Sequence, residues 1–541
     1  MEYFIRAPWR AVTWIHAPDL MWVVAVTVAL IAVWVVRLLR GDSDERRLGS
    51  LLAVLLLLGV SLNAKLAGTV FYARPTAGGP YGVANGTSYA NAWSGFAAVT
   101  GLSAGDTLKS CGDFVAADAD SGGSGAFRNQ DVAGERTTGD CSAEGGASES
   151  NWYLSGSGKS YGILCNTAAL CQDSQWASIH VHDAPIRGFY IRNDLNDTDI
   201  VNFTGTDLSC TDTIGTEGSA PWCVAGWGAN ATLTSITSTR STDDSVHWQG
   251  ADVTVQYSHF YNPGYNIAAG SFIGDCVQII TQTARAKIHH NYCDKRNANA
   301  DGNVSKSCWI IGDPASAGGG EISDNECWLP KTGNSTFESK SILSSGDDVK
   351  ILRNFVSGGY YGIFAFGANN TVVGNVVVDA EYRGIEIPTV TASGTTLVAN
   401  NTVIGSPIGY ILKGASAAVT VNAYNNVAHN QSTYGYEKVS ATYNQSNNRC
   451  SGSTPTCSNN AGTISTVSDP GFTGGLTPTN VDGFCLDTDS PLIGAGTYLG
   501  AWATGYNNED LGKPPAIGAR GTCYGRPLVT SRPAVTSRPS N

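Results

Sequence analysis

Short strand-forming patterns recur along the middle of the chain. Between residues 180 and 430, an apolar residue is followed by two variable residues, an Asn and a further strand-forming residue. The successive Asn positions are separated by 34, 29, 21, 26 and 25 residues, which is the range of one solenoid turn. We expect their side chains to stack and to hydrogen-bond along the coil as structural residues. The six positions are Asn291, Asn325, Asn354, Asn375, Asn401 and Asn426.

A second pattern is a small residue, most often Gly, followed by strand-like alternation. Two strands per repeat, each too short to bury a face alone, must stack on their counterparts one turn away, about 4.8 Å apart. The two patterns therefore predict an all-β chain that forms a right-handed parallel β-helix solenoid with a narrow apolar core. The second pattern occurs at Ser245–Trp248, Cys276–Ile279, Gly362–Ala365, Gly384–Ile387 and Gly409–Leu412.

The N-terminal residues 1–67 are predicted to be a membrane segment. Two apolar runs, Leu20–Val36 and Leu48–Leu62, flank an Arg-rich stretch that the positive-inside rule places in the cytoplasm. One interpretation is a transmembrane hairpin. The other is an anchor followed by a secretory signal that is cleaved after Ala64. Both place the β-helix outside the cytoplasm, either membrane-anchored or secreted.

Composition narrows the class of protein. The chain has 541 residues, of which 14% are charged, and 64 are Gly, which argues against an all-helical or a disordered protein. Its net charge of −12 and the lack of a basic stripe argue against nucleic acid as a partner. The Thr-Ser-Arg-Pro repeats beyond residue 525 predict a disordered tail over residues 526–541.

The 14 cysteines all follow the apolar runs, and no Cys-x-x-Cys pair occurs. Disulfides are therefore expected rather than a zinc site, in agreement with export to an oxidising compartment. Neighbours along the chain are predicted to pair, for example Cys165 with Cys171, Cys210 with Cys223, and Cys450 with Cys457. The adjacent His289 and His290 are expected to divide between surface and core, because neighbouring strand residues point to opposite faces, so they should not share a metal ion.

The ends of the repeat region strengthen the prediction of the fold. An opening segment, Asn85–Trp93, leads to Ala104–Asp106, and the region closes with Ser490–Gly496 and Ala516–Ala519. With the repeats, these segments resemble the pectate-lyase-like right-handed parallel β-helix superfamily. The resemblance implies one β-helix domain over residues 68–525 and a carbohydrate-active protein. The superfamily includes polysaccharide lyases, polygalacturonase-like hydrolases and non-catalytic adhesins, so it leaves the chemistry open.

Candidate site residues should form rows on one outer wall of the coil. If Val246 and Val277 point inward, the next positions form a row at 31-residue intervals, namely His247, Gln278, Trp309 and Lys340, continued by Phe364, Glu386 and Ile411. A second row contains Asp244, Asp275, Lys306, Phe337, Tyr361 and Arg383. Aromatic faces between polar groups suit sugar rings, which assigns substrate binding to Gln278, Trp309, Tyr361, Phe364 and Glu386. The competing interpretation is an ordinary solvated strand surface with cross-strand charge pairs.

The first of two candidate mechanisms is a lyase that acts by β-elimination on a uronate-containing polysaccharide. Asp244, Asp275 and Asp243 would hold Ca²⁺, which neutralises the uronate carboxylate. Lys340 or Lys306 would remove the adjacent proton. Arg383 would assist at the carboxylate and His247 would lie beside the acidic residues.

The second mechanism is hydrolysis, with Asp244 and Asp275 as an acid and base pair beside His247. The stretches Ser241–His247 and Gly274–Ile279 are similar to the paired acidic motifs of polygalacturonase-like hydrolases, but the later rungs depart from that family's pattern. No complete lyase motif is present either, and strand spacing does not choose between the two. We rank the lyase first, the hydrolase second, and a glycan-binding adhesin without catalysis as the alternative of a different class.

Overall fold

The computed structural model describes residues 68–520. The gaps in that range are 121–124, 131, 166–167, 192–198, 216–220, 265–273, 281–284, 297–306, 313–318, 332–338, 389–392, 414–418, 440–441, 453–455, 460, 462–463, 475–480, 503–510 and 512–515. Residues 69–541 form one compact unit, distinct from residues 1–68. The predicted membrane segment and the predicted tail over residues 526–541 both lie outside the described residues.

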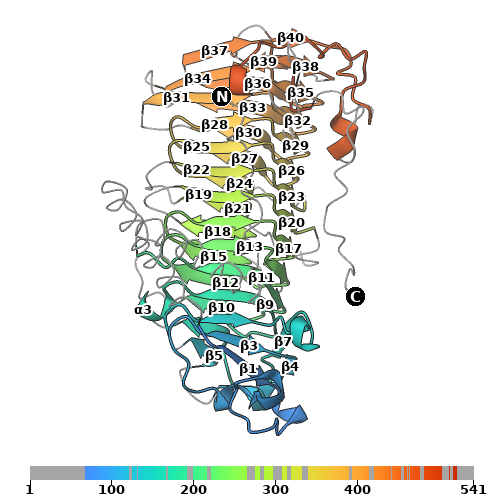
Figure 1. Ribbon diagram of the computed structural model, residues 1–541. Helices are drawn as coiled ribbons and strands as arrows, with labels where there is room; N and C mark the ends of the chain where they lie inside the picture. Colours follow the sequence, from blue (N-terminus) through green and yellow to red (C-terminus); the bar gives the residue numbers. More distant parts are fainter. Residues whose placement is uncertain are drawn as a thin grey trace, which may run out of the picture. The chain divides into compact units, whose positions relative to one another are not determined.

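Two β-sheets, in which all strand pairings are parallel, make up the coil (Figure 1). They fit the right-handed parallel β-helix that the repeats predict. The smaller sheet has 13 strands in the order β39-β36-β33-β30-β27-β24-β21-β18-β15-β12-β10-β8-β5, and we call it the first wall. Its strands are β5 (Ala126–Gln130), β8 (Tyr161–Cys165), β10 (Arg187–Ile191), β12 (Trp222–Trp227), β15 (Val246–Gln249), β18 (Val277–Ile280), β21 (Ser307–Ile311), β24 (Lys340–Ser344), β27 (Tyr361–Ala365), β30 (Arg383–Ile387), β33 (Ile408–Lys413), β36 (Tyr434–Val439) and β39 (Thr456–Asn459).

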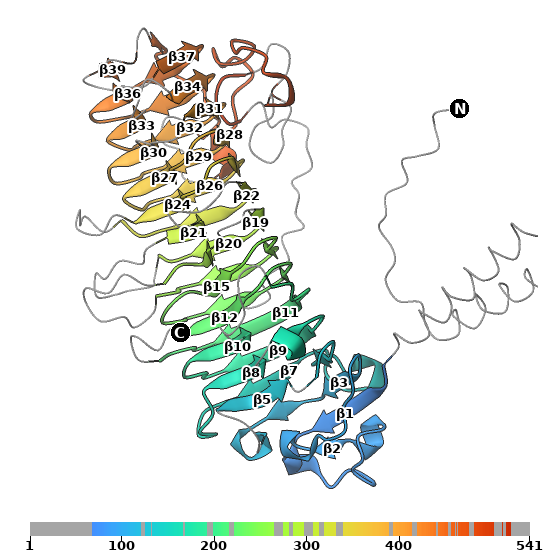
Figure 2. The same cartoon turned by 90° about the vertical axis from the view of Figure 1, so that its left-hand side faces the viewer.

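The larger sheet has 27 strands, which lie beside the first wall on the other sides of the coil (Figure 2). Its N-terminal strands are β1 (Val70–Arg74), β2 (Trp93–Ser94), β3 (Thr107–Ser110), β4 (Asp113–Phe114), β6 (Arg136–Thr138), β7 (Ser150–Tyr153), β9 (Gln175–His182) and β11 (Thr204–Thr211). The second wall continues with β13 (Thr232–Thr234), β16 (Thr254–Gln256), β19 (Ala286–His289), β22 (Gly320–Ser323), β25 (Val349–Leu352), β28 (Thr371–Val373), β31 (Gly394–Ala399), β34 (Val419–Tyr424) and β37 (Thr442–Ser446). The third wall continues with β14 (Thr237–Thr239), β17 (His259–Tyr261), β20 (Tyr292–Asp294), β23 (Glu326–Trp328), β26 (Phe355–Ser357), β29 (Val376–Val378), β32 (Thr402–Ile404), β35 (Val427–His429), β38 (Arg449–Ser451) and β40 (Ser465–Thr466).

Helical segments are short within the described part of the chain. They are α3 (Ala168–Cys171) and the 3₁₀ turns η1 (Thr76–Gly78), η2 (Tyr89–Asn91), η3 (Phe96–Ala98), η4 (Ala116–Asp118), η5 (Ser142–Glu144), η6 (Val481–Phe484) and η7 (Gly500–Trp502). Among the residues that the structure describes, no helix is long and apolar enough to cross a membrane.

Each central turn of the coil contains three strands, one more than the sequence patterns suggested. The strands of the second and third walls are separated by only two residues, as between β19 and β20, so they read as one element in the sequence. The first of these two linking residues has a positive φ on successive turns, for example 56° at Asp324 and 71° at Gly374. This left-handed residue lets the chain change direction abruptly, and the next position is the repeating Asn.

The predicted Asn ladder is confirmed, and it continues to Asn448. Each side-chain amide donates to the Oδ1 of the Asn one turn further on at 3.0 Å, and the backbone N–H of the same residue donates to the same oxygen at 2.9–3.1 Å. The amide also donates to a backbone carbonyl of the preceding turn, such as Ile351 for Asn375. Because all the ladder side chains are buried, each bond satisfies a group that water cannot reach.

We expect Asn375→Ala to destabilise the coil by roughly 2–4 kcal/mol, because it leaves buried donors of Asn354 and the carbonyl of Ile351 without partners. Urea unfolding followed by circular dichroism measures the change. The control is Asn422→Ala, which removes a solvent-facing Asn pair with Asn444 and should cost less than about 0.5 kcal/mol. Equal effects of the two substitutions would contradict the role given to the ladder.

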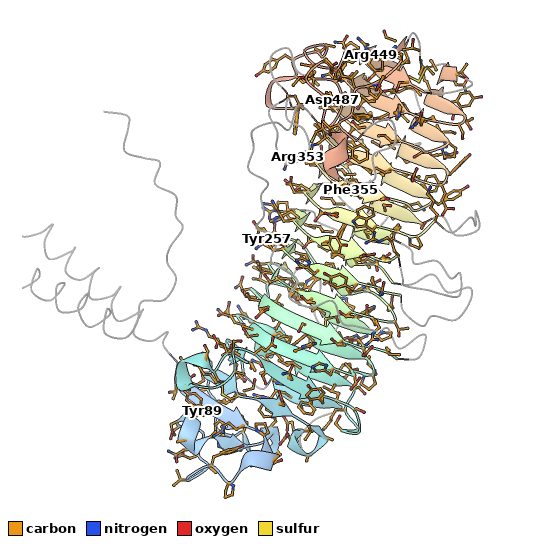
Figure 3. The ribbon with its side chains drawn as sticks, turned by 90° about the vertical axis from the view of Figure 1, so that its right-hand side faces the viewer. Tyr89, Tyr257, Arg353, Phe355, Arg449 and Asp487 are labelled. Carbon is orange, nitrogen blue, oxygen red and sulfur yellow. A yellow bond between two sulfur atoms is a disulfide. The ribbon has the colours of Figure 1, made fainter. Side chains whose placement is uncertain are left out.

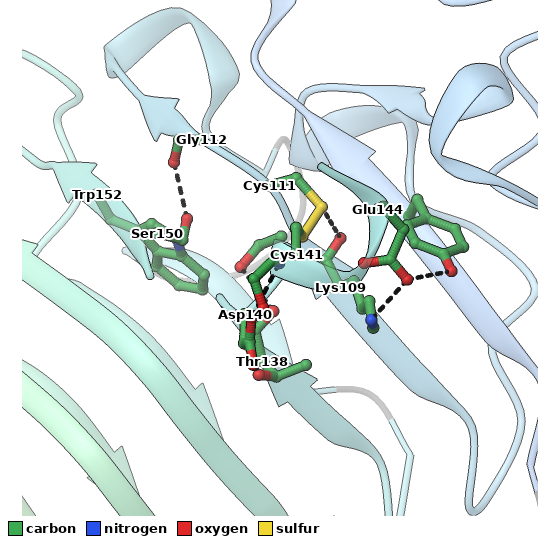
Figure 4. The surroundings of a disulfide bond; sticks show 12 residues. Lys109, Cys111, Gly112, Thr138, Asp140, Cys141, Glu144, Ser150 and Trp152 are labelled. Atoms are coloured by element: carbon green, nitrogen blue, oxygen red, sulfur yellow. Dashed lines mark hydrogen bonds and ion pairs between the residues drawn. A yellow bond between two sulfur atoms is a disulfide. The ribbon is translucent and has the colours of Figure 1, made fainter. Parts of the chain in front are cut away.

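Disulfides cross-link the interior between neighbouring segments of the chain. The predicted pairs Cys165–Cys171, Cys210–Cys223 and Cys450–Cys457 are confirmed, and three further bonds also join neighbours along the chain. These are Cys111–Cys141, Cys276–Cys293 and Cys308–Cys327. Figure 4 shows the Cys111–Cys141 bond, close to the ion pair of Lys109 with Glu144 at 2.7 Å. These six bonds within the described residues fit an extracellular or otherwise oxidising environment.

The C-terminal part of the chain covers one stretch of the third wall. One outward apolar side chain from each of β26, β29, β32 and β35 (Phe355, Val376, Ile404 and Val427) belongs to a second core with residues from Phe472 to Ala519. Phe355 of β26, labelled in Figure 3, contacts Phe484 of this segment, with ring centroids 6.2 Å apart. The first wall takes no part in this packing, so the candidate site lies on a different side of the coil.

Candidate functional site

The register of the first wall confirms part of the predicted row and corrects the rest. His247 of β15 pairs with Gln278 of β18, as expected. At the next strand the pairing is shifted by one residue, so Ile310 is opposite Gln278 and Trp309 is opposite the inward Val277. Trp309 is therefore fully buried, and its prediction as a sugar-binding residue on the outer wall is wrong. A shift of one residue moves a side chain to the other face of a strand.

Lys340 also lies in a different row from the predicted one. It begins β24 opposite Ser307 and Tyr361, so it belongs with Tyr361 and Arg383 rather than with His247. Its Nζ is 5.4 Å from the ring centroid of Tyr361 and 5.3 Å from that of Phe364. Such contacts stabilise the protonated amine, which opposes the role of a neutral base. Lys306, the other candidate base, lies outside the described residues.

Glu386 and Arg383 belong to an ion cluster further along the wall. The row positions of Phe364 and Glu386 are confirmed, since the two residues are paired between β27 and β30. The Glu386 carboxylate is buried, with Arg383 at 2.5 Å on one oxygen and Lys413 at 2.9 Å on the other. Because both oxygens already have cationic partners, Glu386 orders the wall rather than offering a free acceptor to a sugar.

The acidic residues do gather at the start of β15 and β18. Asp244 Oδ1 accepts the backbone N–H of Asp275 at 2.7 Å, and its Oδ2 lies 2.9 Å from Nδ1 of His247. Asp244 and Asp275 are 3% and 2% exposed, so substrate has little access to either. Asp244 therefore joins two turns of the coil and orients the imidazole.

His247 is held in a parallel stack against Trp222 of β12, with ring centroids 4.2 Å apart and planes 3° apart. Burial lowers the pKa of His247 to about 4, although Asp243, Asp275 and Gln278 oppose that shift. The imidazole is thus neutral at physiological pH. With Nδ1–H donated to Asp244, Nε2 carries the lone pair of the neutral ring, and Gln278 forms a side-chain hydrogen bond with the same imidazole.

Asp243 is the titratable carboxyl of this cluster that solvent can reach, because it is only partly buried. Burial raises the pKa of Asp243 to about 7, and the neighbouring charge of Asp244 acts in the same direction. A carboxyl with this pKa is substantially protonated near neutral pH, so it can deliver a proton to a leaving group.

Two cations of the cluster were missed by the sequence reasoning. Lys295, directly after β20, is completely buried and donates from Nζ to the backbone carbonyls of Gly274 and Ser307. Burial lowers the pKa of Lys295 to about 8, while the carboxylates of Asp275, Asp244 and Asp243 oppose the shift. The alternation of strand residues could have predicted that Lys295 is buried, because Cys293 points inward, Asp294 outward and Lys295 inward again.

Arg187, at the start of β10, is the second cation. Its guanidinium lies over aromatic rings, 4.0 Å from the centroid of Tyr190 and 4.5 Å from that of Trp222. Burial lowers the pKa of Arg187, and Asp243 is among the groups that oppose this. No carboxylate in the described part of the chain forms a salt bridge with Arg187. Arg187 is opposite Trp222 on the neighbouring strand, a pairing that the sequence pattern beginning at Ser245 did not reach.

Two of the three residues proposed for calcium, Asp244 and Asp243, are poor ligands for that ion. Both oxygens of Asp244 are engaged, and Asp243 is substantially protonated near neutral pH. In the described ranges, the only group of three or more His, Cys, Asp or Glu donors that lie within 4.8 Å of one another is Cys276, Cys293 and Cys308. These sulfurs belong to two disulfides on adjacent turns, so they are not thiolate ligands.

Comparisons with known proteins add little to the geometry. No protein-family model and no curated protein matches the chain. A solved structure described as "Crystal structure of pectate lyase Pel9A" is similar over 85% of this chain and 98% of that chain, with 14% identity and a TM-score of 0.35. The parallel β-helix is therefore established by the strand pairings themselves.

Proposed function

We propose that the first wall binds a uronate-containing polysaccharide and cleaves it by β-elimination at Arg187, Asp243 and His247. The observation that carries this proposal is the division of the cluster into two layers. Asp244, Asp275 and Lys295 are buried, whereas the three proposed residues remain partly accessible. The accessible layer therefore combines a cation, a protonated carboxyl and a neutral imidazole.

Each accessible group matches one requirement of β-elimination. Arg187 pairs with the uronate carboxylate and so acidifies the proton on the adjacent carbon. Nε2 of His247 accepts this proton, and the electron pair of the broken C–H bond forms the carbon–carbon double bond. The bond to the glycosidic oxygen breaks, and Asp243 donates its proton to that oxygen.

Hydrolysis is less well supported, because its base would have to be Asp275. That side chain is 2% exposed, which leaves little room for an attacking water beside it. Aromatic side chains flank the accessible groups along the wall, with Tyr161 opposite Arg187 and Trp227 opposite Gln249. Such rings support the binding of sugar faces. The disulfides support action outside the cytoplasm, anchored by the N-terminal segment or secreted.

The test is to incubate the purified full-length protein with a panel of uronate polymers and to follow two products separately. Ultraviolet absorbance of the unsaturated sugar reports elimination, and total reducing ends report all cleavage. Unsaturated product that disappears in His247→Gln supports the proposal. Reducing ends without unsaturated product would select hydrolysis, and binding without either product would select an adhesin. Both outcomes overturn the lyase.

Calcium removal gives an independent prediction. Because Arg187 takes the role that calcium would have, we expect EDTA to change the cleavage rate by less than about twofold. Dialysis against chelator followed by rate measurement, with and without added Ca²⁺, checks this. A complete loss that Ca²⁺ restores would mean that the acidic residues rearrange around an ion.

A further inference from the structure

His289, the last residue of β19, and His290, the first residue of the turn before β20, point toward each other. The expectation that His289 and His290 divide between surface and core is wrong, because His290 has a φ of 57° and ends the alternation of the strand. Their Nδ1 atoms lie 3.0 Å apart. The ring of His290 is exposed and that of His289 is partly buried.

We propose that His289 and His290 form a two-nitrogen chelate for a divalent transition-metal ion, with Cu²⁺ as the best match. Two neutral imidazoles can share this short contact only if one Nδ1 carries a proton that the other accepts. A metal ion replaces that proton and uses both lone pairs. The site is remote from the proposed reaction, since it lies between the second and third walls.

The distance between the two nitrogens selects the coordination geometry. With metal–nitrogen bonds of about 2.0–2.1 Å, a separation of 3.0 Å corresponds to an angle of about 94° at the metal. That angle suits the square-planar or tetragonal arrangement of Cu²⁺ and Ni²⁺. A tetrahedral Zn²⁺ site would need nitrogens about 3.3 Å apart.

Charges of both signs surround the two histidines. The charged groups that act on His289 are Lys287, Glu321 and Asp324. Asp324 is held by Arg353 at 2.7 Å and Glu321 accepts the hydroxyl of Ser323 at 2.6 Å. The carboxylates of Glu321 and Asp324 attract a cation, whereas Lys287 and Arg353 repel it, so the two imidazole nitrogens supply the affinity and water completes the coordination.

The position is open to solvent. The Tyr257 ring centroid is 5.1 Å from that of His290, and Tyr257 is 47% exposed. Figure 3 labels Tyr257 and Arg353, which mark the edge of the coil along which this turn lies. An ion can therefore reach the two nitrogens without a change in the fold.

A second histidine pair in the chain offers a matched control. His180 and His182 of β9 stack with ring centroids 4.0 Å apart, but their Nε2 atoms lie 2.8 Å from Thr211 Oγ1 and 3.3 Å from Asn151 Oδ1. Side by side in a strand, these rings present their faces to each other and do not form a chelate.

The test is a Cu²⁺ titration of the full-length protein at pH 7, followed by calorimetry and by electron paramagnetic resonance. We expect one equivalent whose spectrum shows two coordinated nitrogens. His289→Asn and His290→Asn should each weaken binding at least about tenfold. His182→Asn should change it by less than about twofold. Asn tolerates the positive φ of position 290, so this variant keeps the turn.

Two results would overturn the proposal. Unchanged affinity in the double variant His289→Asn/His290→Asn would place the ion elsewhere. Equal affinity of the folded and urea-unfolded wild-type protein would mean that sequence adjacency alone, and not the folded turn, provides the two ligands.

Discussion

Asp243→Asn is expected to lower the cleavage rate by about 10²–10⁴-fold, because an amide cannot donate the proton that the leaving oxygen needs. Asn has nearly the same shape as Asp, and with a pKa of about 7 the carboxyl it replaces is substantially protonated near neutral pH, so the fold should tolerate the change. The rate of formation of unsaturated product at saturating polymer measures the effect. Asp212→Asn is the control, because Asp212 forms a surface ion pair with Arg240 after β11 and should leave the rate unchanged.

The pH dependence of the wild-type rate follows from the same two groups. Asp243 must be protonated to act as an acid, so the rate should fall as pH rises through about 7. His247 must be neutral to act as a base, so the rate should also fall as pH drops through about 4. We expect a bell-shaped profile between these limits, whose alkaline limb is absent from the residual activity of Asp243→Asn. A rate that rises through pH 7 would assign Asp243 the role of the base.

Most of the fold could be predicted because its determinants repeat along the chain. The Asn ladder was visible as a spacing, and it forms because each Asn follows a residue that turns the chain between two strands. Disulfide pairing could be predicted for the same reason, since neighbours along a coil remain neighbours in space. The third strand of each turn was missed because only two residues separate it from the second.

The candidate site was harder to predict because it depends on loop lengths. The interval of 31 residues correctly predicted that His247 is paired with Gln278, because β15 and β18 start one residue before these two positions. It failed at Trp309, since the next turn is one residue longer and the large indole fills the interior. Spacing identifies which strands are neighbours, but only the packing decides which residue of a strand points outward.

Lys295 explains how three carboxyl groups can gather on one wall. Its ammonium group is completely buried beneath them, and it bridges the turns that contain Gly274 and Ser307. Burial lowers the pKa of Lys295, whereas the charges of Asp275 and Asp244 act to raise it, so this cation is a buried counter-charge for both carboxylates. The acidic cluster therefore depends on a residue that substrate cannot touch.

Lys295→Met should consequently destabilise the protein by about 3–5 kcal/mol, the usual cost of removing one partner from a buried charge cluster. It also leaves the carbonyls of Gly274 and Ser307 without their donor. Urea unfolding measures the loss, and Lys350→Met on the exposed face of β25 is the control, with a change below about 0.5 kcal/mol. A second effect separates electrostatics from packing. Loss of the cation raises the pKa of Asp243 further, so the alkaline limb of the rate profile should move above pH 7. If the alkaline limb of the pH–rate profile does not move, Lys295 stabilises the site through packing and not through its charge.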